Sequence, residues 1–183
     1  MDALTLLLNR RSTHALAAPA PEGDALEAIL QAALRVPDFQ RLRPYHFILA
    51  SGEGLDRLGV LLEQAAIASA KPADIIERCR RMPLRAPLVV VVVARWRQHN
   101  IVSRFEQQLS AGCAVMAMQM AAVAQGFGGV WRSGWPMFDR NLHQALDLAE
   151  DDQIVGFLYL GTPTRPHAEP LPEVAVGDYV RVL

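Results

Sequence analysis

Lysine and cysteine are both scarce in this sequence of 183 residues. Lys71 is the only lysine, so the chain has no phosphate loop of the kind in which Lys precedes Ser or Thr. Cys79 and Cys113 are too few for a disulfide framework, and Cys113 lies in an apolar segment where we expect its thiol to be buried and unreactive. The formal net charge of −1 gives no indication of non-specific binding to nucleic acid.

Long apolar runs are missing as well. The main apolar stretch, from Leu109 to Ala124, is interrupted only by Ser110 and Gln119. Crossing a bilayer takes roughly 20 apolar residues, so this stretch is too short and is interpreted as a helix buried on every side. Gly126 is expected to end that helix. Because the start of the chain lacks a basic segment followed by a cleavage site, we expect a cytoplasmic protein without a signal peptide.

The composition and periodicity are those of a globular protein. Apolar residues make up 51% of the chain and charged residues 20%, which predicts a single domain over residues 1–183. The run 88–94 is uninterrupted and β-branched, so we expect it to be buried on both faces in the middle of a sheet. Helices and strands are interleaved, which indicates an α/β or α+β fold. The patterns predict helices over 2–9, 24–35, 54–70, 72–81, 141–148 and from Ser103 onward, and strands over 45–50, 88–94, 130–133, 154–160 and 179–183.

Two short segments carry groups suited to ligand binding. Residues 10–12 place two guanidinium groups and a hydroxyl in a row, which can hold a phosphate; the alternative is a solvated helix C-terminus. Residues 131–133 place an aromatic ring and a cation next to glycines, as a planar electron-accepting ring system would require. The alternative for this segment is a core tryptophan beside an exposed arginine.

Other signatures of chemistry are missing. The five histidines are scattered, without metal-ligand spacing to Cys, Asp or Glu, so we expect no metal site. No serine lies in a Gly-x-Ser-x-Gly elbow, and the glycines of 126–129 follow a helix instead of a strand, which is the wrong context for a dinucleotide loop. We therefore expect no catalytic side chain and an enzyme whose cofactor carries the reaction.

The sequence closely resembles the small nitroreductases of the YdjA type. The resemblance rests on Asn9 to Ser12, the helix from Ser110 to Gly129, the turn Trp131 to Gly134 and the strand Ile154 to Pro163, and it is lost mainly in the tail. It implies an α+β nitroreductase-like fold with a central, mainly antiparallel sheet flanked by helices. It also implies a homodimer with FMN bound between the subunits.

The same resemblance implies the site residues. One subunit would bind the FMN phosphate and ribityl end, and line the ring, through Arg10, Arg11, Ser12, Trp131, Arg132 and Ser133. The other subunit would contribute Arg35 and Phe39. Relatives of this protein have a His at the position of Phe39, and that His can donate a hydrogen bond, whereas Phe39 cannot. The nicotinamide contact would lie at Ala121, Ala122, Val123, Ala124, Gln125 and Gly126. Because a helix C-terminus disfavours phosphates, that contact should involve the uncharged part of the nucleotide.

The resemblance implies an FMN-dependent oxidoreductase that passes hydride from NAD(P)H through flavin to a nitro compound, a quinone or an activated enone. Phe39 and the altered loop 42–45 could instead close the acceptor pocket, leaving a flavin-binding carrier protein without nitroreductase turnover. A helical dimerisation module without cofactor is a third alternative. We expect neither a nucleic acid nor a membrane partner.

Overall fold

A five-stranded sheet with only antiparallel pairings is the centre of the structure, a computed structural model that describes residues 2–166 and 171–183. The strand order is β2–β3–β5, and β4 and β1 both pair along the other edge of β5. All seven residues of β3 are buried, which confirms the prediction for 88–94. The strands are β1 (Leu16–Ala17), β2 (Tyr45–Ser51), β3 (Leu88–Ala94), β4 (Gly128–Arg132) and β5 (Gln153–Pro163).

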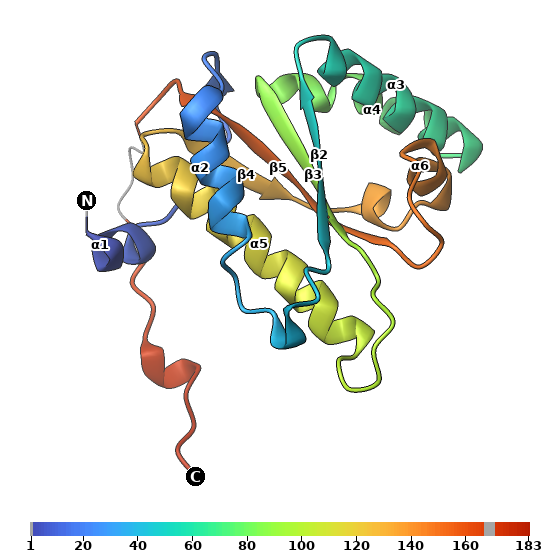
Figure 1. Cartoon of the computed structure of the whole chain (residues 1–183). Helices are drawn as coiled ribbons and strands as arrows, with labels where there is room; N and C mark the ends of the chain where they lie inside the picture. Colours follow the sequence, from blue (N-terminus) through green and yellow to red (C-terminus); the bar gives the residue numbers. More distant parts are fainter. Residues whose placement is uncertain (1, 167–170) are drawn as a thin grey trace.

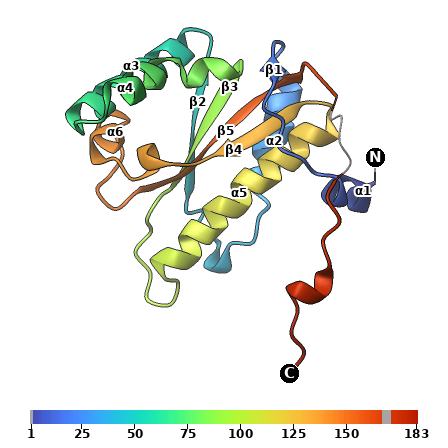
Figure 2. The ribbon, with the colours of Figure 1, turned by 180° about the vertical axis from the view of Figure 1, so that it is seen from behind.

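Helices cover both faces of this sheet (Figures 1 and 2). One face packs against α2 and α5, and the other packs against α3, α4 and α6. Short 3-10 turns connect these elements. The helices are α1 (Ala3–Leu8), α2 (Gly23–Ala33), α3 (Glu53–Ala68), α4 (Ala73–Arg81), α5 (Arg104–Ala124) and α6 (Arg140–Ala145), and the turns are η1 (Phe39–Arg41), η2 (Pro83–Arg85), η3 (Trp135–Met137) and η4 (Val176–Asp178).

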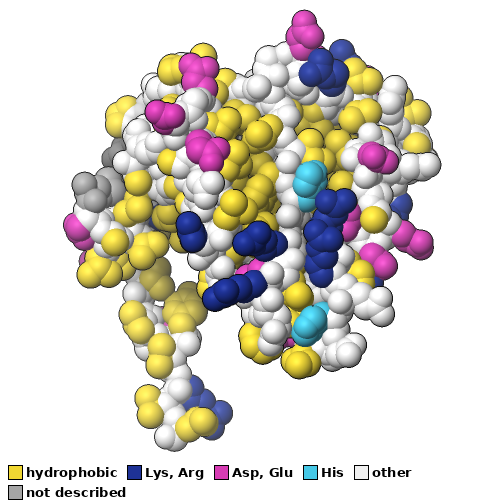
Figure 3. Space-filling model, viewed as in Figure 1, with side chains coloured by type: hydrophobic (Ala, Val, Ile, Leu, Met, Phe, Trp, Pro, Cys, Tyr) yellow, Lys and Arg dark blue, Asp and Glu magenta, His cyan; other side chains and the backbone are white. Residues whose placement is uncertain are grey.

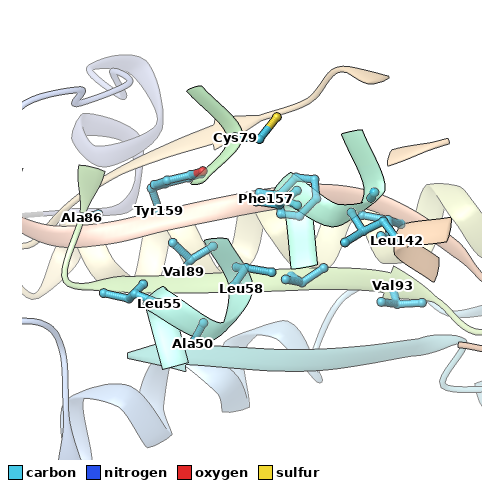
Figure 4. Packing of buried hydrophobic residues seen from close by; sticks show 14 of the residues in the cluster. Ala50, Leu55, Leu58, Cys79, Ala86, Val89, Val93, Leu142, Phe157 and Tyr159 are labelled. Atoms are coloured by element: carbon cyan, nitrogen blue, oxygen red, sulfur yellow. The ribbon is translucent and has the colours of Figure 1, made fainter. Parts of the chain in front are cut away.

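The core on the α3 side shows how the layers fit together. Figure 4 shows Leu58 of α3, Val89 of β3 and Phe157 of β5 directed into one cluster. Val89, Val91 and Val93 of β3 belong to this cluster, whereas Val90 and Val92 belong to a second cluster on the α2 and α5 side, because successive strand residues point to opposite faces. This arrangement confirms the predicted α+β fold with its antiparallel sheet flanked by helices.

Local signals in the sequence set several helix boundaries. Ser103 and Glu106 form a capping box at the start of α5, and Asp2 caps α1. Gly126 follows the end of α5 with φ of 88°, a conformation that glycine adopts without strain. The predicted starts and stops of these helices are thereby confirmed to within a few residues.

The interpretation of α5 as a helix buried on every side is wrong. Leu109 is 53% exposed, and Phe105, Cys113 and Met116 are exposed as well. Their spacing places them in one line along α5, which we call the α5 stripe. The opposite side of the helix packs on the sheet through Val115 and Met118. The segment from Leu109 to Ala124 is apolar on all sides, which predicted complete burial, but no described residue of this chain covers the α5 stripe.

Two predictions about strands are also corrected. Residues 179–183 form no strand: they follow η4, are exposed, and have no neighbouring strand among the described residues. The β-branched side chains there predicted a strand, but a strand needs a hydrogen-bonded partner. Conversely, β1 was not among the predicted strands, because two residues are too few to show an alternating pattern. Residues 171–183 lead away from the sheet (Figure 1).

None of the described helices is long and apolar enough to cross a membrane. The cytoplasmic location and the single domain over residues 1–183 stay predictions.

Candidate functional site

Two pockets meet at Trp131 and Ser133, at the end of β4. The first, which we call the α5 pocket, has a volume of about 420 Å³. Its lining combines one cation, two hydroxyls and one amide with apolar side chains: Arg10, Ser12, Met116, Gln119, Trp131, Ser133, Met137 and Val155. The structure thus brings together, in one pocket, residues of the two segments that the sequence singled out.

The second, which we call the β4 pocket, has a volume of about 320 Å³ and lies on the α3 and α4 side of the sheet. Its apolar walls come from α3, β4, β5, η3 and Met82, which directly follows α4. The remaining lining residues are His14, Arg78, Arg85, Arg132, Ser133 and Tyr159. Arg132 therefore lies in this pocket, while Arg10 and Ser12 lie in the α5 pocket.

Trp131 forms the wall between the two pockets. Its indole Nε1 donates a hydrogen bond of 3.2 Å to the carbonyl oxygen of Val155. That carbonyl is available because the pairing of β3 with β5 shifts register here, and Val155 has no Cα partner in β3. The side chain is 42% exposed, so the alternative of a core tryptophan is wrong.

Glycines allow the N-terminal segment to lie against β4. The backbone N–H of Thr13 donates to the carbonyl oxygen of Gly129 at 2.9 Å. A Cβ on Gly128 would lie 2.9 Å from the Cβ of Thr13, so only glycine fits at this position without a shift of the segment. Gln119 of α5 donates a second hydrogen bond of 2.8 Å to the Gly129 carbonyl. These contacts hold residues 10–14 at the mouths of both pockets.

Arg132 carries an unsatisfied donor in the β4 pocket. Its Nη2 lies 3.4 Å from Nδ1 of His14, and its guanidinium carbon lies 5.4 Å from the ring centroid of Tyr159. Its Nε is buried and has no hydrogen-bond partner in the residues described. Buried donors are nearly always paired in folded proteins, so this one indicates a group that the pocket receives from outside the chain.

The electrostatics of the β4 pocket are positive. No Asp or Glu belongs to its described lining, and Arg78, Arg85 and Arg132 form no ion pair with any described carboxylate. Burial raises the pKa of the Tyr159 phenol, and the positive charges of Arg132 and Arg85 act against that shift. The pocket therefore suits an anion or an electron-rich ring edge.

Sequence reasoning missed His14, Arg78 and Arg85. Arginine is spread along the whole chain, so the basic stretch 78–85 carries no distinguishing signal. Arg11, in contrast, was expected in the site but lines neither pocket.

Arg35 and Phe39 lie away from both pockets within this chain. Arg35 lines a separate depression of about 490 Å³ beside Arg41 and Arg43, and Phe39 is 58% exposed. Basic side chains gather near the middle of the face that carries α2 and β2 (Figure 3). Positive φ angles recur in this loop, at Gln40, Arg41 and Arg43, and such strain is concentrated at functional sites.

Residues 121–126 form the last turn of α5 and its cap, and none of them lines either pocket. Gln125 instead donates to the carbonyl oxygens of Ala121 and Ala25, at 3.0 and 3.3 Å. The structure does not join the predicted nicotinamide segment to the other site residues.

Metal-ligating groups do not cluster in residues 2–166 and 171–183: no three or more His, Cys, Asp or Glu side chains there could hold an ion. His167 lies outside the described residues. The predicted lack of a metal site stays a prediction.

Comparisons with known proteins match both the sequence and the fold of the chain. A model of the nitroreductase family matches residues 7–162. YdjA of Escherichia coli strain K12, which carries the provisional name of an NAD(P)H nitroreductase, is 53% identical over 163 residues, covering 89% of each chain. A nitroreductase-like family protein from Bacillus cereus superposes with a TM-score of 0.84 at 22% identity, covering 100% of this chain and 96% of that one. A nitroreductase with bound FMN from Bacteroides fragilis superposes with a TM-score of 0.76 at 24% identity, covering both chains fully.

Proposed function

Because the chain belongs to the nitroreductase family, an oxidoreductase family, we propose that it is an FMN-dependent enzyme. It would pass reducing equivalents from NAD(P)H to an electrophilic acceptor such as a nitro compound, a quinone or an activated enone. The observation that carries this proposal is the meeting of residues 10–12 and 131–133, far apart in the sequence, around two adjoining pockets.

The residues of the two pockets fit FMN. Arg10 and Ser12 offer a guanidinium group and a hydroxyl to a phosphate, with Arg11 next to them in the chain. The unsatisfied Nε of Arg132 offers a donor to a ring carbonyl or ring nitrogen. Trp131 offers a flat apolar wall between them. A polar, anionic end and a planar, electron-accepting end are the two features that FMN combines.

The chemistry supplied by a bound FMN is acceptance of a hydride and delivery of electrons to the acceptor. The chain itself has to bind and orient. The hydrogen bond from Trp131 to Val155 fixes the indole, so this wall is already in place before a ligand binds. Arg132 holds a permanent positive charge 5.4 Å from the ring centroid of Tyr159, and its side chain is half-buried, with Nε out of contact with solvent.

We further propose that the protein is a homodimer, with Arg35 and Phe39 reaching the flavin of the other subunit. Within one chain these two residues lie outside both pockets, so a second copy is required for them to take part. The α5 stripe supports this arrangement, because its exposed Phe105, Leu109 and Met116 present an apolar surface next to the α5 pocket.

The nicotinamide contact at residues 121–126 remains part of the proposal. Since this segment is a helix C-terminus, it would contact the uncharged part of the nucleotide.

The decisive experiment is an anaerobic absorbance spectrum of the purified protein with FMN, before and after addition of NADPH or NADH. We expect a flavin spectrum that bleaches with reductant and returns on addition of a nitro compound or a quinone. A flavin spectrum that bleaches with neither donor, or one that no acceptor reoxidises, would favour the carrier protein. A protein that binds no FMN would contradict both.

A further inference from the structure

The β4 pocket carries positive charge that is not needed to bind the FMN phosphate, because the proposed phosphate site at Arg10 and Ser12 lies in the α5 pocket. Three of its lining residues are arginines, and its described lining contains no carboxylate. Two of the three, Arg78 and Arg85, belong to parts of the chain that carry no predicted site residue.

The fold holds these two arginines at the pocket. Arg78 lies on α4 next to Cys79, which is fully buried against α3 and β5. A Cβ on Gly59 of α3 would overlap with the carbonyl oxygen of Arg80, so the two helices are in close backbone contact. Arg85 ends η2, just after the buried Pro83 and before β3. The backbone on both sides of the pair is therefore rigidly placed.

The pair has no local partner that would neutralise it. Arg81, on the same helix, is engaged by Glu77 at 2.7 Å, whereas neither Arg78 nor Arg85 forms an ion pair or a side-chain hydrogen bond with another described residue. Both side chains reach solvent, so their charges are stable without a partner. They remain available to a ligand in the pocket.

The position of Arg78 and Arg85 relative to the α5 pocket indicates which part of a bound FMN would lie next to them. The two pockets share Trp131 and Ser133, so a ligand whose phosphate lies at Arg10 and Ser12 would extend past Trp131 toward the β4 pocket. The end of FMN away from its phosphate is the ring that accepts electrons. A hydride from a reduced nicotinamide brings two electrons and one proton, leaving the nicotinamide oxidised and the ring with one additional negative charge.

We propose that Arg78 and Arg85, together with Arg132, stabilise the negative charge of the reduced flavin ring and so raise its reduction potential. This inference rests on the proposed function, and it assigns to α4 and η2 a role in tuning the cofactor. Because the phosphate carries the same charge in both redox states, residues that held only the phosphate would not change the potential.

The test compares wild type with the double variant Arg78→Gln/Arg85→Gln. We would measure the dissociation constant of oxidised FMN and the midpoint potential of the bound flavin by anaerobic dye equilibration. We expect oxidised FMN to bind nearly as in wild type and reduced FMN to bind about tenfold more weakly, which lowers the potential of this two-electron couple by about 30 mV. Arg78→Lys/Arg85→Lys, which keeps both charges, should restore most of the potential.

Arg81→Gln is the matched control, because it removes an arginine of the same helix that is already paired. An unchanged potential in the double glutamine variant would overturn the inference. So would an equal weakening of oxidised and reduced FMN, or complete loss of FMN, since the arginines would then hold the cofactor without distinguishing its redox states. If wild type itself binds no FMN, the proposed function fails as well, so the two failures are distinguishable.

Discussion

The indole of Trp131 lies directly against the backbone of Gly156, so closely that a Cβ at residue 156 would overlap with Nε1 and lie 3.1 Å from Cε2. The neighbouring residue, Val155, is skipped at the register shift between β3 and β5, and its carbonyl accepts the indole N–H. The register shift and Gly156 in β5 therefore form the surface, here called the seat, against which the Trp131 indole packs between the two pockets. Nothing in the pattern of the strand 154–160 indicated this seat.

Gly156→Ala should displace Trp131. The overlap forces either the indole or β5 to move, so we expect a loss of about 1–3 kcal/mol of unfolding free energy and, with the hydrogen bond to Val155 broken, about tenfold weaker FMN binding. Urea unfolding and an FMN titration measure the two effects. Gly177→Ala is the control, because a Cβ there meets nothing within 4 Å. FMN affinity equal to wild type would show that Trp131 is not part of the ring site.

Arg10 and Arg11 should differ in their effect on FMN binding. Arg10 lines the α5 pocket, whereas Arg11 lines neither pocket. A hydrogen bond to a charged group contributes roughly 1.5–3 kcal/mol, so Arg10→Ala should weaken FMN binding about 10- to 100-fold. Arg11→Ala should have a smaller effect. Titration of each apo-variant with FMN gives the comparison, and a larger loss for Arg11→Ala would place the phosphate elsewhere.

Leu109→Glu should dissociate the proposed homodimer. Leu109 lies in the middle of the α5 stripe, and a carboxylate buried at an interface without a partner is strongly unfavourable. We expect the variant to sediment as a monomer with weakened FMN binding. Ile67→Glu is the matched control: Ile67 is an equally exposed apolar residue of α3, away from the stripe. A wild-type monomer with a full complement of FMN would rule out a site shared between subunits.

Stability should fall with pH below about 6.5 because of His143. This ring is 2% exposed; its Nδ1 lies 2.7 Å from a guanidinium nitrogen of Arg140 and its Nε2 lies 2.8 Å from the carbonyl oxygen of Met137. Since arginine only donates, the imidazole is neutral, with its proton on Nε2. Burial, aided by the Arg140 charge, lowers its pKa below the ordinary value of 6.5.

The unfolded chain therefore binds a proton at a higher pH than the folded chain does. Stability is complete above pH 6.5 and is lost as the pH falls from there toward the lower pKa of the folded state. Urea midpoints at pH 7.5 and 5.5 measure this loss. His143→Gln cannot be protonated, so its midpoint should change less between the two pH values. An equal change in both proteins would assign the pH dependence to other groups.

Local signals predicted local structure well. The β-branched run 88–94 predicted a buried strand, and Ser103 predicted the start of α5, where the structure shows it capping the helix through hydrogen bonds made within one turn. Residues 10–12 and 131–133 were singled out because guanidinium, hydroxyl and indole groups suit an anion or a ring, and the family resemblance then favoured this interpretation over the structural alternatives. In each case, the physical cause lies within a few neighbouring residues.

Predictions failed where the cause lies in a distant segment. The apolar periodicity of α5 could not distinguish the side that packs on the sheet from the stripe that this chain leaves exposed. The β-branched tail 179–183 predicted a strand, but strand formation depends on a neighbour that the described chain does not provide.

The sequence by itself determined the positions of four of the five sheet strands, the main helix boundaries, the family, and the two segments from which pocket residues come. Only the tertiary structure decided that Arg10 and Arg132 belong to different pockets, that Arg78 and Arg85 join the second, and that Arg35 and Phe39 lie apart. Backbone propensity and side-chain chemistry act over a few residues, whereas a pocket depends on how α4, β4 and the N-terminal segment are arranged around the sheet. That arrangement follows from packing the two hydrophobic clusters, which involves residues from the whole chain.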